Sequence, residues 1–410
     1  MAFFYPLPVI LLVIFVVSFI LAIIRTIQTE YANCRIPPGV SNPGKLRFIV
    51  AVLIVASTLG RILEKMELCS SLAVKRFVFS GRRPDPAPGV QQEDARFGRV
   101  PVRVYRPRAP PARPRGAVLL FHGGGWICCS LDSHERICQY IAKESDSLVV
   151  SVGYRLAPEH KYPAAYEDCL SATQHFLQHL QHYAVDPARV TVCGDSAGGN
   201  LAAAVSQTLA GRSDLPRLRA QILIYPGLQA LDFNLPSYQQ NRGVPLLFRE
   251  RALFYSLQYV QGDTSNMQEI LEGSHIPPDM WLKYRKWVSP DNIPEEFKVR
   301  GYKPHKPCEF KPEVFERVKR IREHTLCPLF AEDTIIQQLP ESFILTCEYD
   351  VLRDDGLLYK KRLEDNGVPV TWYHIKDGFH GIVNLFDHFG LSFPSGKKGL
   401  DRVVAFIKGL

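Results

Sequence analysis

One pentapeptide constrains the fold of this chain more than any other stretch, Gly194-Asp195-Ser196-Ala197-Gly198. Residues 189–193 before it are typical of a short buried strand, and residues 200–205 after it are typical of the start of a helix. A turn this short between a strand and a helix leaves no room for bulky neighbours, and glycine lets the backbone bend there. The sequence therefore predicts a sharp strand–turn–helix unit that presents the hydroxyl of Ser196 at one end of a sheet.

Strands and helices alternate along most of the chain after residue 116. Apolar runs typical of buried strands lie at 117–121, 148–152, 189–193, 222–226, 343–346 and 370–374. Helical patterns lie at 164–182, 357–366 and 399–410. This alternation predicts an α/β fold, in which a mostly parallel central sheet is covered by helices on both faces.

Residues 231–329 interrupt the alternation. They are rich in Pro, Trp and Tyr, and their helical patterns lie near 248–260 and 312–323. Almost a hundred residues without a core strand indicate an inserted helical lid at the carboxyl ends of the strands. With 410 residues, of which 46% are hydrophobic, the chain can form one large domain with such a lid. We place this domain at 111–410 and an N-terminal linker and cap region at 25–110.

The first 24 residues carry no charged side chain and are almost entirely apolar. A helix of that length covers about 36 Å, enough to cross the hydrocarbon core of a membrane. No basic residue precedes the segment and no small-residue cleavage site follows it, which favours an uncleaved signal anchor over a cleaved signal peptide. A second apolar stretch, 48–60, has only 13 residues. We expect this stretch to form a buried or interfacial cap helix instead of a second span.

Positive charge gives information about orientation and about partners. Arg25, Arg35 and Lys45 all follow the first apolar segment, so the positive-inside rule would keep the C-terminal side in the cytosol, unless the second stretch also crosses. The net charge of +8 is spread along the chain. Its most basic run, 106–115, alternates Arg with Pro and is typical of an exposed connector, so no nucleic-acid partner is expected.

Two polar residues downstream complete a catalytic pattern with the serine. A serine hydroxyl becomes a nucleophile when a base lies within about 3 Å and an acid orients that base. Asp350 follows the strand at 343–346, and His380 follows the strand at 370–374 in a glycine-lined loop. The order Ser, Asp, His along the chain is that of the α/β-hydrolases. We therefore expect Ser196 as nucleophile, His380 as general base and then acid, and Asp350 as its orienting partner.

Three other carboxylates lie near these residues. Asp354 and Asp355 fall at the start of the next helix, where negative charge favours the helix N-terminus. Asp195 adjoins the serine, and we expect it to have a structural hydrogen-bonding role. Asp350 is therefore the favoured acid.

A glycine run after the strand at 117–121 offers backbone donors for the negative oxygen of an acyl-transfer transition state. In His122-Gly123-Gly124-Gly125-Trp126, we expect the N–H groups of Gly123 and Gly124 to form an oxyanion hole with that of Ala197, each contributing about 3–4 kcal/mol. A simple glycine turn is the alternative. A phosphate cradle is disfavoured because the chain has no Gly-x-x-x-x-Gly-Lys-Ser/Thr motif and no strand–Gly-x-Gly-x-x-Gly–helix unit.

Three histidines with helical spacing raise the question of a metal. His175, His179 and His182 would share one helical face, but Gln178 and Gln181 on the same helix favour a solvated surface. The expected mechanism needs no metal and no cofactor.

Five segments carry a resemblance to a known family: HGGGW (122–126), YRLAPEHKYPAAYED (154–168), GDSAGGN (194–200), YDVLRDDG (349–356) and DGFHG (377–381). They resemble the arylacetamide deacetylase family, in the hormone-sensitive-lipase-like branch of the α/β-hydrolases. The length and the second apolar stretch resemble the deacetylase-like 3 and 4 subgroup. This resemblance implies a single-pass, type II endoplasmic-reticulum membrane protein with a luminal serine esterase or amidase domain.

The resemblance also implies a disulfide between the HGGGW segment and the strand that bears the acid. Cys347 matches one partner. The other falls on Ile127, beside Cys128 and Cys129, so either of these cysteines is a candidate to pair with Cys347.

The sequence thus predicts a membrane-anchored hydrolase that cleaves esters or amides of small apolar acyl or aryl substrates through an acyl-serine intermediate. A lipase for lipid esters differs from it only in substrate. A catalytically inactive ligand-binding protein on the same fold is the rival from another class. Such proteins usually lose the serine or the histidine, and this chain has both.

Overall fold

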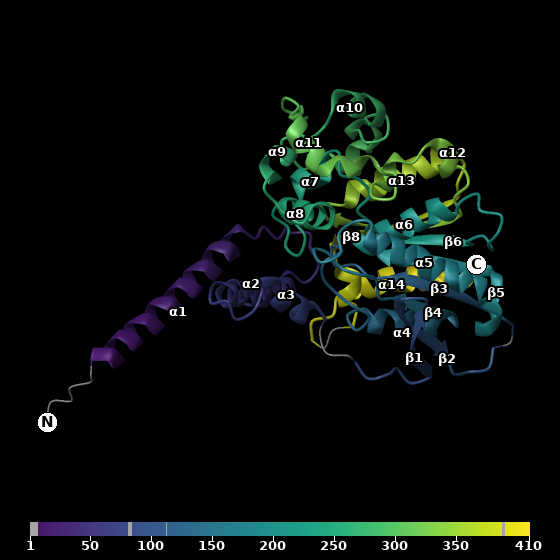
Figure 1. The fold of residues 1–410 in the computed structure, drawn as a ribbon, viewed down its shortest axis with the longest axis horizontal. Coiled ribbons are helices and arrows are strands. Elements are labelled where there is room, and N and C mark those ends of the chain that lie inside the picture. Colours follow the sequence, from purple (N-terminus) through teal and green to yellow (C-terminus); the bar gives the residue numbers. More distant parts are fainter. Residues whose placement is uncertain (1–6, 81–83, 112, 388–389) are drawn as a thin grey trace.

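The computed structural model describes residues 7–80, 84–111, 113–387 and 390–410 (Figure 1). Its described strands form an eight-stranded sheet in the order β1-β2-β4-β3-β5-β6-β7-β8. The strands are β1 Val90–Phe97, β2 Val100–Pro107, β3 Arg115–Phe121, β4 Leu148–Val152, β5 Val185–Asp195, β6 Ala220–Ile224, β7 Glu341–Tyr349 and β8 Val370–Phe379. All pairs from β4 to β8 are parallel, while β2 pairs antiparallel with both β1 and β4. The predicted mostly parallel sheet is confirmed.

The sheet has helices on both faces, as predicted. Successive side chains of β3 point to opposite faces: Leu119 and Phe121 belong to one hydrophobic cluster, and Val118 and Leu120 belong to the other. Helices α5 Ala164–Gln178, α6 Ala197–Leu209 and α13 Arg353–Asp365 pack in the first cluster. Helices α4 Glu135–Ser145 and α14 Pro394–Gly409 pack in the second.

Strand β1 was not predicted. Residues 80–92 are rich in Pro, Gly and Arg, a composition typical of a loop, yet β1 begins at Val90 and covers the outer edge of β2. Only its end residues, Val90 and Phe97, are buried, and the residues between them are exposed or half-buried. Because the middle of this edge strand faces solvent, it lacks the alternating apolar pattern by which strands are recognised.

In the inserted segment 231–329, the regular secondary structure consists of helices. Every residue between β6 and β7 is described, and none of them forms a strand. Its α-helices are α7 Pro236–Gln240, α8 Arg249–Val260, α9 Met267–Leu271, α10 Pro278–Tyr284 and α11 Pro312–Val318, and α12 Asp333–Ile336 follows before β7. Helices α7 to α11 gather at one side of the molecule, at the top of Figure 1.

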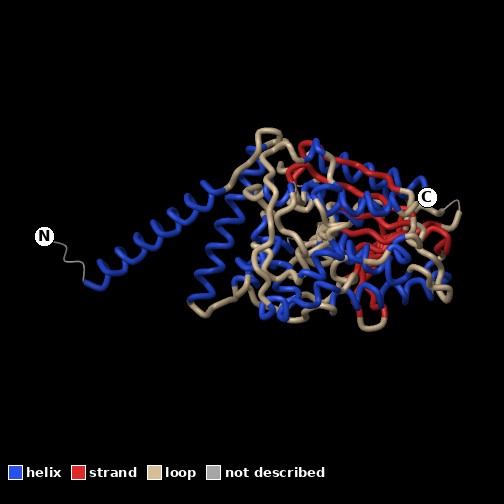
Figure 2. Tube along the Cα trace, turned by 90° about the horizontal axis from the view of Figure 1, so that it is seen from above, coloured by secondary structure: helices blue, strands red, loops and turns tan. Residues whose placement is uncertain are grey.

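Three helices precede the sheet: α1 Leu7–Asn33, α2 Pro43–Lys65 and α3 Ser71–Ser80. Helix α1 projects away from the body, at the end that α2 and α3 cover (Figures 1 and 2). The predicted anchor, 1–24, begins outside the described residues and continues as α1. Between residues 9 and 21, every side chain of α1 is exposed.

The expected length of the second apolar segment is wrong. Helix α2 has 23 residues because the polar residues flanking 48–60 continue the helix on both sides. Among the described residues it is long and apolar enough to cross a membrane by length and composition, and α1 holds a shorter apolar stretch, Val9–Arg25. A turn at 66–70, where Glu67 has a φ of 56°, separates α2 from α3.

Candidate active site

The turn that holds Ser196 is as tight as the sequence predicts. Ser196 joins β5 to α6 with φ 55° and ψ −120°, a conformation that costs energy for a residue with a side chain. A Cβ atom on Gly194 would lie 2.1 Å from the carbonyl oxygen of Gly198, and one on Gly198 would lie 1.9 Å from that of Phe121. Only glycine fits at either position, so the two flanking glycines allow the turn to form.

The structure brings the three predicted catalytic side chains together. Asp350 follows the last residue of β7, His380 follows the last residue of β8, and these two strands are neighbours. His380 Nδ1 lies 2.8 Å from Asp350 Oδ2, and His380 Nε2 lies 2.9 Å from Ser196 Oγ. Asp350 is fully buried, and its other carboxylate oxygen accepts a hydrogen bond from the Leu352 N–H at 2.9 Å. This geometry can transfer a proton from the serine to the imidazole while the carboxylate orients the ring.

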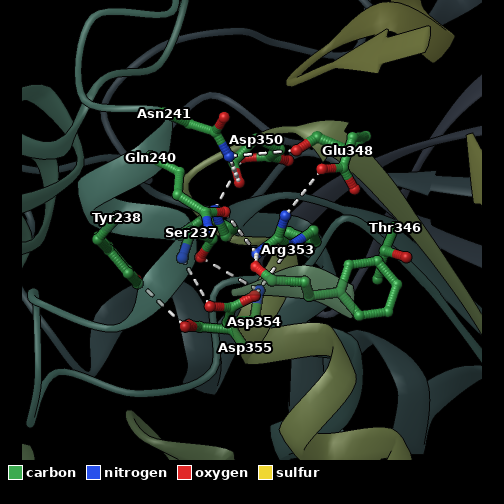
Figure 3. Close-up of polar contacts among 12 residues, drawn as sticks. Ser237, Tyr238, Gln240, Asn241, Thr346, Glu348, Asp350, Arg353, Asp354 and Asp355 are labelled. Atoms are coloured by element: carbon green, nitrogen blue, oxygen red, sulfur yellow. Dashed lines mark hydrogen bonds and ion pairs between the residues drawn. The ribbon is translucent and has the colours of Figure 1, made fainter. Parts of the chain in front are cut away.

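The two neighbouring acids lie at the start of the next helix, as predicted, but their contacts to the lid were not predicted. Asp354 and Asp355 lie in the first turn of α13, and both are fully buried. Asp354 accepts a hydrogen bond from the Ser237 N–H at 2.6 Å, and Asp355 accepts one from the Tyr238 hydroxyl at 3.2 Å (Figure 3). The two carboxylates therefore fasten α7 of the lid to α13.

Burial raises the pKa of Asp355 to about 7. Hydrogen bonds from the N–H of Leu228 and from the side chains of Gln229 and Tyr238 favour the ionised form and act in the opposite direction.

Arg353 links the acid-bearing loop to the lid, and sequence reasoning missed it. Its guanidinium is fully buried at the centre of Figure 3. It donates to Asp354 at 2.9 Å, to Glu348 at 3.1 Å and to the carbonyl oxygen of Phe297 at 2.8 Å. The side chain of Asn241 donates to the carbonyl oxygen of Asp350 at 2.9 Å. The lid residues thus hold the loop that places Asp350.

The structure corrects the predicted oxyanion hole at one position. The N–H of Gly123 donates to Asp195 Oδ1 at 2.7 Å, so it has no hydrogen left for a substrate oxygen. Within the described chain, the N–H groups of Gly124 and Gly125 donate to no protein acceptor. Gly125, Ser196 and Ala197 line the same cavity. The available donors on the glycine run are therefore the N–H groups of Gly124 and Gly125, one residue beyond the predicted pair, Gly123 and Gly124.

Asp195 holds the glycine run in place. Besides the Gly123 N–H, its carboxylate contacts His134 Nε2 at 2.9 Å and accepts a hydrogen bond from Asn384 Nδ2 at 3.0 Å. Burial opposes ionisation of this group, but His134 and the hydrogen bonds outweigh that effect and lower the pKa of Asp195 to about 2. The predicted structural role of Asp195 agrees with these contacts.

The cavity at Ser196 is mainly apolar. The empty space at this site, between the sheet and the lid, has a volume of about 610 Å³, counted together with the solvent at its open mouth. From the sheet side it is lined by Trp126 and Leu352, and from the lid by Phe233, Leu247 and Tyr255. Such walls suit an apolar group beside the nucleophile.

The expected disulfide is absent. In the described structure Cys128, Cys129 and Cys347, the three cysteines that the predicted pairing concerns, are free thiols. Cys128 and Cys347 are both buried but belong to different hydrophobic clusters, so the structure does not pair them. Among the described residues, no group of three His, Cys, Asp or Glu side chains could hold a metal ion. His175 instead stacks on Phe97, with ring centroids 4.8 Å apart.

Comparisons with known proteins agree with this geometry. A family model described as the alpha/beta hydrolase fold matches residues 118–274 and 308–384. Arylacetamide deacetylase-like 4 from Homo sapiens is 45% identical over 98% of this chain and 98% of its own length. Neutral cholesterol ester hydrolase 1 from Mus musculus is 36% identical over 92% of this chain and 95% of its own length. A hyperthermophilic esterase from the archaeon Pyrobaculum calidifontis has a TM-score of 0.60 at 27% identity, covering 86% of this chain and 93% of that one.

Members of the deacetylase-like 3 and 4 subgroup are 43–47% identical to this chain. The resemblance read from the five sequence segments is therefore confirmed. The chain belongs to the arylacetamide deacetylase-like family of the α/β-hydrolases, and it is a carboxylic-ester hydrolase.

Proposed function

We propose that the enzyme works through an acyl-serine intermediate on Ser196. The oxygen of Ser196 attacks the substrate carbonyl carbon while its proton passes to His380 Nε2, and Asp350 stabilises the imidazolium that forms. The negative oxygen is held by the N–H groups of Gly124, Gly125 and Ala197. His380 then gives its proton to the leaving alcohol or amine. In the second half of the reaction water attacks the acyl carbon and passes a proton to His380, which returns it to the Ser196 oxygen as the acid leaves. The observation that supports this proposal is the continuous Ser196–His380–Asp350 contact, at 2.9 and 2.8 Å.

The substrates we propose are esters or amides with apolar acyl or aryl groups. The support is the lining of the cavity, where Trp126, Phe233 and Leu247 surround the serine with little polar surface. The names of the relatives, arylacetamide deacetylase-like 4 and neutral cholesterol ester hydrolase 1, point in the same direction. A panel of p-nitrophenyl esters of increasing acyl length would test this, with the highest kcat/KM expected for chains longer than acetyl.

We also propose that α1 anchors the enzyme in the endoplasmic-reticulum membrane, with the catalytic domain in the lumen. A helix of 27 residues extends for about 40 Å, and its side chains from 9 to 21 are all exposed. Family membership supports the luminal side. Protease digestion of intact microsomes should then leave the catalytic domain uncut. Digestion would instead place it in the cytosol, the side that Arg25, Arg35 and Lys45 favour.

Replacement of the nucleophile is the central test. Ser196→Ala should abolish p-nitrophenyl ester hydrolysis and labelling by a fluorophosphonate probe. Ser206→Ala is the matched control because Ser206 is a buried serine on α6 with no hydrogen-bond partner for its hydroxyl. Unchanged hydrolysis in Ser196→Ala would refute the nucleophile, and a wild-type protein that stays unlabelled would favour the ligand-binding alternative.

A further inference from the structure

Exposed apolar side chains are concentrated on one segment of the body. Outside α1, ten large apolar side chains are exposed among the described residues, and all but Leu282 and Val299 lie on α2, α3 or the turn between them. These eight are Phe48, Val52, Val55, Leu59, Met66, Leu68, Phe77 and Phe79. We call them the α2–α3 face. An apolar surface of this extent on one hairpin indicates a binding surface.

Helix α2 is two-sided, which excludes a span across the membrane. Leu46, Val50 and Ile54 are buried in the same hydrophobic cluster as α4 and α14. Phe48 and Val55, with the rest of the α2 stripe, recur at helical spacing on the other side, where they are 58% and 47% exposed. A spanning helix would leave the catalytic domain and meet lipid all round. Helix α2 instead keeps one side on the domain and turns only the other side outward.

The α2–α3 face is continuous with the anchor and carries suitable charge. Helix α1 leaves the body at the end that α2 and α3 cover (Figures 1 and 2). Of the six Lys or Arg in residues 43–80, Arg47, Arg61 and Lys65 are exposed beside these apolar side chains, together with two exposed Glu. Apolar side chains flanked by basic residues are typical of a surface that lies in the headgroup region of an anionic membrane.

The inner side of α3 contacts the segments that line the active-site cavity. Arg76 Nε donates to the carbonyl oxygen of Ile127 at 2.8 Å, just beyond the glycine run, and Arg76 Nη2 donates to that of Ala157 at 2.8 Å. Lys75 Nζ lies 5.3 Å from the ring centroid of Phe254 on α8, whose neighbour Tyr255 lines the cavity. Helix α3 therefore contacts residues that adjoin the lining of the catalytic pocket, Ile127 beside Trp126 and Phe254 beside Tyr255.

From these observations we propose that the α2–α3 face lies in the surface of an anionic lipid bilayer, as a second membrane contact beside the anchor, and that apolar esters reach the pocket from the lipid along this face. The proposal rests on the anchoring by α1 proposed above. The partner of the α2–α3 face is then the bilayer surface, and apolar substrates would enter the pocket directly from the lipid.

The chain holds two exposed native cysteines that can test the contact. Cys69 lies in the turn between α2 and α3, and Cys308 lies in the lid. In full-length protein with Cys34→Ser, a fluorescent probe is attached to Cys69 (with Cys308→Ser) or to Cys308 (with Cys69→Ser). The protein is reconstituted in vesicles of phosphatidylcholine and phosphatidylserine, with or without brominated acyl chains. We expect bromine to quench the probe on Cys69 and not the probe on Cys308; equal quenching of both, or of neither, would overturn the proposal.

This test separates the two proposals because it requires no catalysis. Protein that fails to float with the vesicles would contradict the anchor, whereas protein that floats with an unquenched probe on Cys69 would contradict only the α2–α3 contact. Hydrolysis gives a second readout. Phe48→Glu with Phe77→Glu should lower the hydrolysis of a long-chain ester dissolved in the vesicles about tenfold and leave a water-soluble acetate ester unaffected. Leu282→Glu, at a lid side chain that is 69% exposed, is the matched control and should change neither rate.

Discussion

Replacement of Asp195 by Asn tests whether a buried charge holds the oxyanion loop. The carboxylate is ionised against the N–H of Gly123 and the side chains of His134 and Asn384, which lower its pKa from 3.8 to about 2. Because one pKa unit corresponds to about 1.4 kcal/mol, the ionised form contributes about 2 kcal/mol to the free energy of unfolding at neutral pH. Since the pKa is lower in the folded state, this contribution is present above pH 3.8 and is lost as the pH falls towards 2.

Urea denaturation of the full-length chain in detergent, followed by tryptophan fluorescence at neutral pH, measures this effect. Asp195→Asn should lower the free energy of unfolding by about 2 kcal/mol and also lower kcat for a soluble ester, because the glycine run loses its anchor. Asp214→Asn is the matched control: the pKa of Asp214 is also lowered to about 2, by its hydrogen bond to Arg212, but that pair is exposed to solvent. An Asp195→Asn curve that overlays those of the wild type and the control would refute the reasoning.

Three further predictions concern other groups. His380→Gln should reduce kcat about 10⁶-fold with an unchanged circular dichroism spectrum, and a loss smaller than about tenfold would exclude His380 as the base. The pKa of Asp355 is raised from 3.8 to about 7, so the folded state binds the extra proton and stability should fall as the pH rises across that interval. Asp355→Asn should remove this slope, as measured by denaturation midpoints below and above the interval. Alkylation of the denatured, non-reduced chain, followed by peptide mass mapping, should modify both Cys128 and Cys347, whereas two unmodified thiols at these positions would reveal a disulfide between them.

The contact among Ser196, His380 and Asp350 was predictable because each residue follows a recognisable strand. Ser196 lies in a turn whose glycines have no substitute, and Asp350 and His380 each follow an apolar run by a few residues. Parallel strands bring their carboxyl ends to one edge of a sheet, so order along the chain becomes proximity in space. No similar rule distinguishes the glycines of the run at 123–125 from one another. The carboxylate of Asp195 decides which N–H groups remain available, and its position is known only once β5 and the glycine loop have packed.

Other features were not predictable because polar or charged residues stand where an apolar pattern would have indicated them. Strand β1 is polar between its ends, and α2 carries charged residues near both of its ends, which conceal its length. Arg353 stands in a charged string, Arg353-Asp354-Asp355, which is typical of a solvated helix start. It is fully buried because lid residues more than fifty positions earlier cover it, and a single sequence gives no sign of that contact.

The position of β8 at the rim of the sheet sets how the enzyme will fail when heated. His380 directly follows β8, which among the described strands pairs only with β7. Ser196 directly follows β5, which pairs with a strand on each side. Rim strands fray at a lower free-energy cost than interior ones. Warming should therefore abolish hydrolysis through local opening of β8 while most of the sheet remains folded. Cooling should restore hydrolysis without global refolding. We therefore expect activity to be lost, in a thermal ramp followed by hydrolysis and circular dichroism together, at a lower temperature than the secondary structure.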